Sequence, residues 1–336
     1  MKFFKFFLVI FLLIPQLAQA IYRVYTGNIG DRKVEFYIYA IPDSTFNIRY
    51  IDDKTFKIKQ LGLPEKKGNN YIFKEYSGDS EGDVNSILIK NFDFNENKAN
   101  SENKILKGYS TEFGEFTLEK KFEYNVVWDD EDKNIQNQAQ SLFNNVEFDN
   151  IEFLQVDSTD NFYFKVLISK KKKDDIRIKG INIYSKKNGE LYQTILNSKG
   201  YRFYTFSALS IGDFDFDGIK DDLSLADGET SGVNVPHKYY LYDKSSEKFV
   251  DANLEGYIFD FDNDKKIATS TKTCDELTKD STSITLNKMY FLMKKQQKFQ
   301  YLENYCLVSS DEFIRKCTSK EKQSCENKIV KPTDDL

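Results

Sequence analysis

Leu209-Ser-Ile-Gly-Asp213-Phe-Asp-Phe-Asp-Gly-Ile-Lys-Asp221, followed by Leu223-Ser-Leu-Ala226, places carboxylates at alternate positions around a single glycine. Calcium takes six to eight oxygen ligands, and this spacing lets one short loop supply most of them. Position 12 is Ser224 instead of the glutamate of an EF-hand, and the chain continues into a strand-like run. The stretch therefore predicts a calcium loop between two strands, with the ligands Asp213, Asp215, Asp217, the Ile219 carbonyl and Asp221.

An acidic turn without a metal is the alternative interpretation of this loop. Aspartates this close together repel one another strongly when nothing neutralises them, which favours a bound cation. Asp260-Phe-Asp-Asn-Asp264 repeats part of the pattern but lacks the glycine and is followed by two lysines. We predict a hairpin turn there, and its own metal binding stays open.

Composition and periodicity predict a mostly β fold. The chain has 29 Phe and 21 Tyr, which pack well on pleated surfaces, and its 5 Pro interrupt few segments. From Tyr22 to about Phe122, short alternating runs predict an antiparallel meander that closes into a barrel or sandwich. The predicted strands are Val34–Tyr39, Phe46–Tyr50, Phe56–Lys59, Tyr71–Phe73, Ser86–Ile89, Ile105–Leu106 and Phe113–Leu118.

The length predicts two antiparallel β modules. We assign residues 21–124 to the N-terminal module, 125–150 to a linker with one short helix, 151–330 to the C-terminal module and 331–336 to a disordered tail. Expected C-terminal strands are Phe162–Ile168, Ile176–Tyr184, Phe203–Leu209, Leu223–Ala226, Tyr239–Tyr242, Glu255–Phe261, Ile267–Thr273, Lys288–Leu292 and Phe299–Tyr301. A brief helix is expected over Asp311–Lys316.

The first twenty residues have the features of an export signal. Lys2 and Lys5 precede an apolar run, and Ala18-Gln-Ala20 resembles a cleavage site. The apolar run is short for a transmembrane helix, and no later segment approaches the length that one needs. We therefore predict a periplasmic or secreted protein that begins at Ile21.

All four cysteines, Cys274, Cys306, Cys317 and Cys325, lie near the C-terminal end of the chain. In an exported chain an even number predicts disulfides, and four cysteines allow three pairings that the sequence does not separate. Cys317–Cys325 with Cys274–Cys306 is one of them. Zinc is disfavoured, because the chain has no tight Cys-x-x-Cys pair.

The charge balance gives no support to nucleic-acid binding. Lys and Arg number 48 against 53 Asp and Glu, which gives a net charge of −5, whereas nucleic-acid binders carry a basic surface. The basic run Lys170–Lys173 lies between two predicted strands, so we interpret it as a solvated hairpin tip and not as a nucleic-acid or membrane patch.

The calcium loop, together with Lys238-Tyr-Tyr-Leu-Tyr-Asp243 and Phe249, resembles a family of bacterial periplasmic proteins that carry an FG-GAP, propeller-blade-like calcium segment. The resemblance covers about Asn182 to Thr273 and implies a propeller-blade-like C-terminal module. Tyr25–Gly30 and Gly108–Leu118 resemble an N-terminal β module that often precedes it. Asp222 departs from the pattern, since the family usually has an apolar residue there.

Some relatives in that family resemble inhibitors of lysozyme-like peptidoglycan hydrolases, and some act as immunity proteins. In such inhibitors a projecting Ser-Gly loop enters the acidic cleft of the enzyme, and Ser231-Gly232 resembles such a tip. The predicted partner-binding loop contains Ser231, Gly232, Asn234 and His237, and an ordinary hairpin loop is the alternative. His237 is the only histidine, so we expect no catalytic role for it.

A binding protein is favoured over an enzyme. Catalysis needs an activated nucleophile, an acid–base pair or an open metal position. The clustered acids have calcium spacing, which leaves a glycosidase-type carboxylate pair as the remaining enzymatic alternative. We expect a calcium-binding inhibitor of a lysozyme-like hydrolase, possessing no enzymatic activity of its own. A calcium-stabilised adhesin or glycan-binding surface protein is the alternative.

Overall fold

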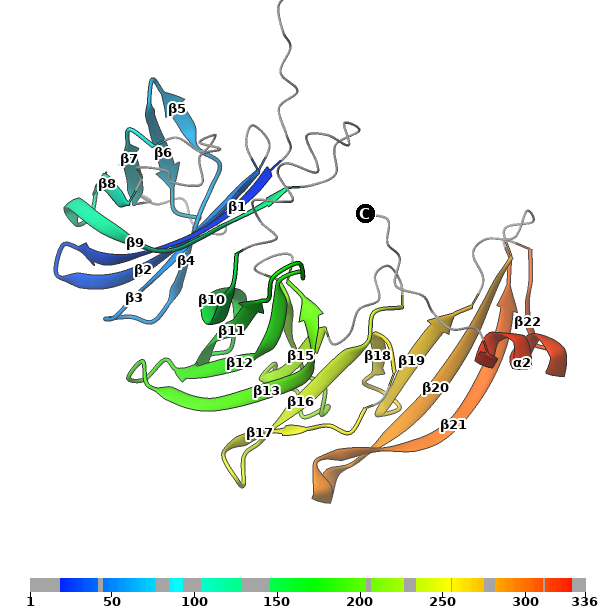
Figure 1. Ribbon diagram of the computed structural model, residues 1–336. Helices are drawn as coiled ribbons and strands as arrows, with labels where there is room; N and C mark the ends of the chain where they lie inside the picture. The colour runs from blue at the N-terminus through cyan, green and yellow to red at the C-terminus, as the bar shows by residue number, and fades with distance from the viewer. Residues whose placement is uncertain are drawn as a thin grey trace, which may run out of the picture.

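The computed structural model describes residues 19–41, 45–76, 85–92, 104–127, 146–203, 207–226, 234–254, 256–274, 282–310 and 312–327. The described residues form four antiparallel sheets that follow one another along the molecule (Figure 1). The mostly β prediction is confirmed. Outside the described residues lie Met1–Ala18 of the predicted export signal, the predicted linker helix, the C-terminal tail and the Ser231-Gly232 tip. Gln19 and Ala20, the last two residues of that signal, are described and belong to the first strand.

The first sheet is a nine-stranded half-barrel in the order β4-β3-β2-β1-β9-β8-β7-β6-β5. The two ends of this strand order approach each other, and there the Gly62 N–H donates to the Lys74 carbonyl at 2.8 Å. Its strands are β1 (Gln19–Ile29), β2 (Arg32–Ile41), β3 (Thr45–Asp52), β4 (Ile58–Leu61), β5 (Glu65–Lys67), β6 (Asn70–Lys74), β7 (Ser86–Lys90), β8 (Ile105–Ser110) and β9 (Gly114–Val127).

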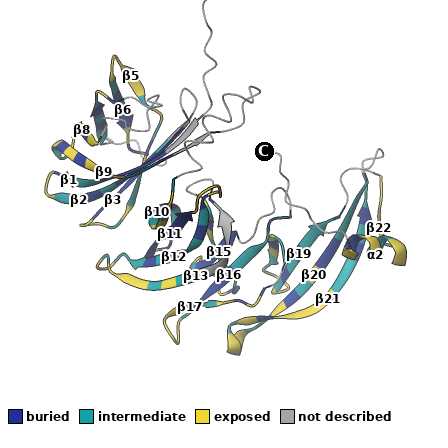
Figure 2. Cartoon of the chain, viewed as in Figure 1, coloured by how far each residue is buried: buried dark blue, intermediate teal, exposed yellow. Residues whose placement is uncertain are grey.

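Strict alternation in β2 gives the half-barrel two apolar surfaces. Phe36 and Ile38 point into the half-barrel and pack in its core, while Tyr37 and Tyr39 face the second sheet. Both sets are buried, so the stretch from Phe36 to Ala40 has no solvated face. Figure 2 shows how buried, intermediate and exposed residues are distributed along the strands.

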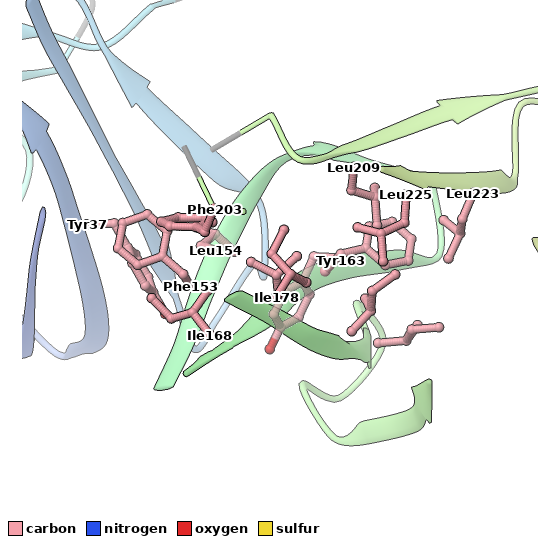
Figure 3. Packing of buried hydrophobic residues seen from close by; sticks show 14 of the residues in the cluster. Tyr37, Phe153, Leu154, Tyr163, Ile168, Ile178, Phe203, Leu209, Leu223 and Leu225 are labelled. Carbon is pink, nitrogen blue, oxygen red and sulfur yellow. The ribbon is translucent and has the colours of Figure 1, made fainter. Parts of the chain in front are cut away.

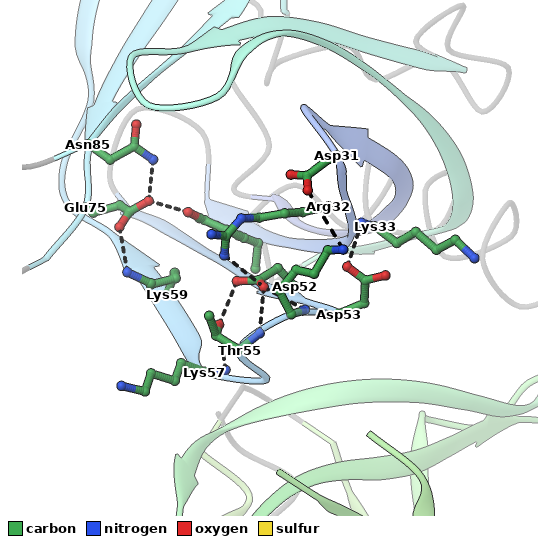
Figure 4. A network of polar contacts seen from close by, with 12 residues as sticks. Asp31, Arg32, Lys33, Asp52, Asp53, Thr55, Lys57, Lys59, Glu75 and Asn85 are labelled. Atoms are coloured by element: carbon green, nitrogen blue, oxygen red, sulfur yellow. Dashed lines mark hydrogen bonds and ion pairs between the residues drawn. The ribbon is translucent and has the colours of Figure 1, made fainter. Parts of the chain in front are cut away.

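Hydrogen bonds and ion pairs between polar side chains also connect segments of the half-barrel (Figure 4). The buried Asp52 carboxylate accepts hydrogen bonds from the Thr55 hydroxyl at 2.8 Å and from Arg32 at 3.2 Å. Burial alone would raise the pKa of Asp52, but these partners lower it. Glu75 binds Lys59 at 3.1 Å across the closing edge. These contacts satisfy carboxylates that would otherwise be costly to bury.

The second sheet contains β10 (Phe148–Ser158), β11 (Phe162–Lys170), β12 (Arg177–Ser185) and β13 (Leu191–Arg202) in chain order. Lys171–Lys173 lies exposed at the β11–β12 hairpin, as predicted, whereas Lys170 is the last residue of β11 and is buried. Strand β9 reaches Val127 and β10 begins at Phe148, so strands form both ends of the segment expected to be a linker. Strand β13 was not predicted, and Phe203, expected to begin a strand, follows its end.

Aromatic packing joins the half-barrel to the second sheet. The Phe153 ring lies 5.8 Å from Tyr22 and 5.4 Å from Tyr37, edge to face in both cases. Beside it, the buried Lys165 ammonium binds Glu35 of the half-barrel at 2.7 Å. The same cluster continues to Leu209, Leu223 and Leu225 of the third sheet (Figure 3). Continuous apolar packing therefore connects three of the four sheets.

The third and fourth sheets also keep the chain order. The third contains β14 (Leu209–Gly212), β15 (Asp222–Ala226), β16 (His237–Asp243) and β17 (Lys248–Asp251). The fourth contains β18 (Phe259–Asp262), β19 (Ile267–Thr273), β20 (Ser283–Met293), β21 (Lys298–Ser309) and β22 (Ile314–Lys316), with the short 3-10 helix η2 (Lys294–Gln296) between β20 and β21. The helix α2 (Ser319–Asn327) packs against β20.

The helix predicted over Asp311–Lys316 is wrong. Ile314–Lys316 forms β22 because it pairs with Leu307–Ser309 at the edge of the fourth sheet. The helix begins later, at Ser319, where the Thr318 hydroxyl accepts the Glu321 N–H at 3.3 Å and Glu321 accepts hydrogen bonds from Thr318. Pairing with the preceding strand, β21, overrode the helical pattern.

Two disulfides are present, and the described residues contain no free cysteine. They join Cys274 to Cys325 and Cys306 to Cys317, which differs from the pairing named above. Both belong to one small core around Leu286 that ties α2 to the fourth sheet. Disulfides of this kind indicate an oxidising environment outside the cytoplasm. Within the described residues, no helix has the length and apolar character that a membrane crossing requires.

Candidate metal centre

The acidic loop connects β14 to β15, as the sequence predicted. Its backbone turns at Phe216 and Gly218, with φ angles of 60° and 90°. An added Cβ at Gly218 would meet nothing within 4 Å, so glycine is favoured there by the positive φ and not by crowding. The predicted sharp turn at Gly218 is confirmed.

Two phenylalanines fix the loop to the protein. Phe214 packs against Tyr239 and Phe261, with ring centroids 5.1 and 4.7 Å apart. Phe216 is buried and lies 6.0 Å from Phe299 in the core between the third and fourth sheets. The alternation of Asp and Phe therefore separates an anchoring face from an acidic face.

Asp213, Asp215 and Asp222 come together, with one carboxylate oxygen of each within 4.8 Å of the others. Among the described residues, these three are the His, Cys, Asp or Glu side chains that lie close enough together to hold a metal ion. Two of these three, Asp213 and Asp215, are predicted ligands. Asp222 is not, since the sequence pattern placed it at the start of the next strand.

Asp222 organises the loop from inside the protein. It is fully buried, and its carboxylate accepts backbone N–H bonds from Phe214 at 2.8 Å and Asp215 at 2.9 Å. Its other oxygen accepts the Tyr242 N–H of β16 at 2.8 Å. These bonds connect the loop to the neighbouring strand. The sequence alone did not reveal this role, because the donors belong to residues 7, 8 and 20 positions away from Asp222.

Backbone N–H groups of the loop also hold the other two carboxylates. The Asp217 N–H is shared between Asp213 at 2.9 Å and Asp215 at 3.0 Å, and the Gly218 N–H donates to Asp213 at 3.0 Å. A carboxylate has about four acceptor positions, so these bonds leave capacity for a cation. The acidic face is therefore preorganised by the chain itself.

The remaining predicted ligands are not part of this group of three carboxylates. Asp217 forms an ion pair with the Lys244 ammonium and accepts the Ile219 N–H at 2.8 Å. Ile219 is exposed, and Asp221 lies outside the group of three carboxylates. Lys266 donates to the Phe216 carbonyl at 3.2 Å. These two lysines offset part of the negative charge, but among the described residues no basic side chain pairs with Asp213, Asp215 or Asp222.

Burial and this excess of negative charge raise the pKa values of two carboxylates of the site. Burial and the neighbouring Asp217 charge raise the pKa of Asp215 to about 6. Burial raises the pKa of Asp222 to about 7, even though backbone N–H groups donate to it. A bound divalent cation would supply the charge that these carboxylates lack. The donor set is entirely oxygen, which suits calcium better than zinc.

The second acidic turn is a hairpin, as predicted. It connects β18 to β19, and the Asp262 carboxylate is occupied by the Lys265 ammonium at 2.7 Å and by the Asp264 N–H at 3.1 Å. The Asp262 carboxylate is therefore satisfied within the turn.

The predicted partner-binding loop is anchored at its C-terminal end. Asn234 exchanges two hydrogen bonds with the Thr273 backbone, both at 2.9 Å. His237 begins β16 opposite Ala226, and burial lowers its pKa to about 4. Both residues therefore serve the packing of β16 and its neighbours.

A scan against models of known protein families matched none of them, and a search of curated proteins found no similar sequence. The family resemblance therefore stands on the residues of this chain alone.

Without metal, the protein is expected to lose stability as pH rises. An unfolded aspartate titrates near pH ~3.9, below the folded values of Asp215 and Asp222. The stability gained from their raised pKa values is fully present below about pH 4 and is lost as pH rises through about 6 and 7. Urea denaturation in chelator between pH 4 and 8 measures this trend.

The variant Asp222→Asn removes one of the two titrating groups and should flatten the trend. Asp264→Asn, on the exposed second turn, is the matched control and should leave it unchanged. A trend that is identical in all three proteins would contradict the assigned protonation.

Proposed function

We propose that the chain is an exported calcium-binding protein that acts by binding another molecule. The observation that carries the proposal is the convergence of Asp213, Asp215 and Asp222 on a loop preorganised by backbone hydrogen bonds. A metal at this site would neutralise buried carboxylates that lack basic partners. It would also lock the β14–β15 loop to β16 through Asp222.

Calcium suits this site better than magnesium. Magnesium demands near-ideal octahedral geometry, whereas calcium accepts irregular sets of six to eight oxygens and bidentate carboxylates. Three carboxylates supply up to six oxygens, and Asp217, Asp221 and the Ile219 carbonyl are the further candidates that the loop sequence offers. Asp217 would leave Lys244 in order to join. Periplasmic or secreted localisation fits this metal and follows from the export signal and the disulfides.

The chain-order connectivity of the second, third and fourth sheets supports a propeller-blade-like C-terminal module. Each sheet is a meander, as in the four-stranded blades of propellers. The acidic loop occupies the first hairpin of the third sheet, and the second acidic turn occupies the first hairpin of the fourth. This repetition agrees with the resemblance to FG-GAP-like calcium segments.

A lysozyme-like peptidoglycan hydrolase is the proposed partner, on the strength of the family resemblance. The loop that carries Ser231 and Gly232 joins β15 to β16, the two strands that Asp222 connects. A loop held at its stem loses little conformational entropy on binding, which favours its use for recognition. Inhibition and not catalysis is proposed, because the clustered acids serve the metal.

Calcium is expected to raise the melting temperature of the mature protein, and chelator to lower it. A ligand that binds only the folded state stabilises by about 2.7 kcal/mol at a hundredfold excess over Kd. Thermal melting with calcium and with chelator measures the shift. Asp215→Asn should abolish it and Asp264→Asn should retain it, whereas equal melting temperatures in calcium and chelator would exclude the site.

Inhibition is expected when the mature protein is mixed with lysozyme-like hydrolases and cell-wall turbidity is followed. Replacement of Ser231 and Gly232 by bulky residues should abolish inhibition, because the tip would no longer enter a narrow cleft, and melting should not change. Full inhibition by that variant would place recognition elsewhere. No inhibition of any tested hydrolase by the wild-type protein would reject this partner class.

A further inference from the structure

A separate cleft of about 530 Å³ lies where the second sheet meets the third. Three turns surround it: the β10–β11 turn with Asp160 and Asn161, the β12–β13 turn with Lys187, and the β16–β17 turn with Glu247. Its size falls within the ~300–1,000 Å³ typical of small-molecule sites. None of these residues belongs to the acidic loop or the predicted partner-binding loop.

Aromatic rings form one wall of the cleft. Tyr192 packs on the buried Phe162, with ring centroids 4.7 Å apart, yet 37% of Tyr192 remains exposed. The Tyr192 hydroxyl is fixed between the Glu247 carbonyl, to which it donates, and the Tyr242 hydroxyl at 3.4 Å. A partly exposed ring is therefore held rigidly at the cleft, which lowers the entropy cost of packing a ligand against it.

Polar groups with spare hydrogen-bonding capacity line the rim. The side chains of Asp160, Asn161 and Lys187 are exposed and make no hydrogen bond or ion pair with the described residues. Lys186, by contrast, is committed to the Ser158 hydroxyl at 2.9 Å and the Thr159 carbonyl at 2.5 Å. The rim thus offers a carboxylate, an amide and an ammonium group, which together both accept and donate.

The charges lining the cleft balance. Asp160 and Glu247 are acidic, while Lys186 and Lys187 are basic. This balance favours neither a phosphate nor a polycation. An aromatic wall beside mixed donors and acceptors suits a ligand that has an apolar face and a rim of hydroxyl or amide groups. We propose that this cleft binds a neutral oligosaccharide.

One residue, Tyr242, contributes both to the cleft and to the hydrogen bonds that Asp222 accepts. Tyr242 lines the cleft with its side chain, while its backbone N–H donates to Asp222 at 2.8 Å. The oligosaccharide site is nonetheless independent of metal and of hydrolase inhibition, because Asp160, Asn161 and Tyr192 are positioned by the second sheet. Failure of the calcium proposal would leave this one standing.

Isothermal titration calorimetry of the mature protein tests the proposal, with N-acetylglucosamine tetramer, cellotetraose and maltotetraose as probes and a sulfated oligosaccharide as the acidic comparison. At least one neutral probe should bind. Asn161→Ala and Tyr192→Leu should each weaken its Kd about tenfold, equivalent to the loss of one hydrogen bond or ring contact.

Matched controls are available on the fourth sheet. Asn263→Ala changes an exposed turn asparagine, and Tyr301→Leu changes a half-exposed tyrosine, so both should bind like the wild-type protein. Asn161 lies on an exposed turn, which keeps the test valid even if Tyr192→Leu folds poorly. Binding of the sulfated probe alone, no binding of any neutral probe at millimolar concentration, or equal weakening in the controls would overturn the proposal.

Discussion

The buried Asp222 carboxylate is the interaction on which the arrangement of the proposed metal site depends. It gathers backbone N–H groups from the acidic loop and from β16, two segments that also touch through the packing of Phe214 on Tyr239. A carboxylate without a cationic partner in a buried position is costly unless hydrogen bonds or a metal compensate it. The three N–H bonds provide part of that compensation and leave a demand for positive charge beside Asp213 and Asp215.

The aromatic junction supplies the rigid support for this arrangement. Phe153 and Lys165 of the second sheet contact the half-barrel, and the same apolar cluster reaches the strands that flank the acidic loop. Because protein interiors are close-packed, a loop mounted on this cluster has little freedom to shift relative to the half-barrel. The half-barrel and the metal loop are thus parts of one packed structure.

Sequence patterns predicted most strands and the turn at Gly218, because alternation and positive φ leave local signatures. They did not reveal Asp222, whose role depends on donors from Phe214 and from Tyr242, a strand away. The helix expected over Asp311–Lys316 was wrong for a similar reason, since pairing with β21 decides that segment. The disulfide pairing likewise depends on how α2 folds back onto the fourth sheet.

The most direct test of the central claim is a crystal structure of the calcium-loaded protein with anomalous scattering data. We expect a calcium peak about 2.3–2.6 Å from carboxylate oxygens of Asp213, Asp215 and Asp222. Crystals grown in excess calcium that show no peak among these three carboxylates would contradict it.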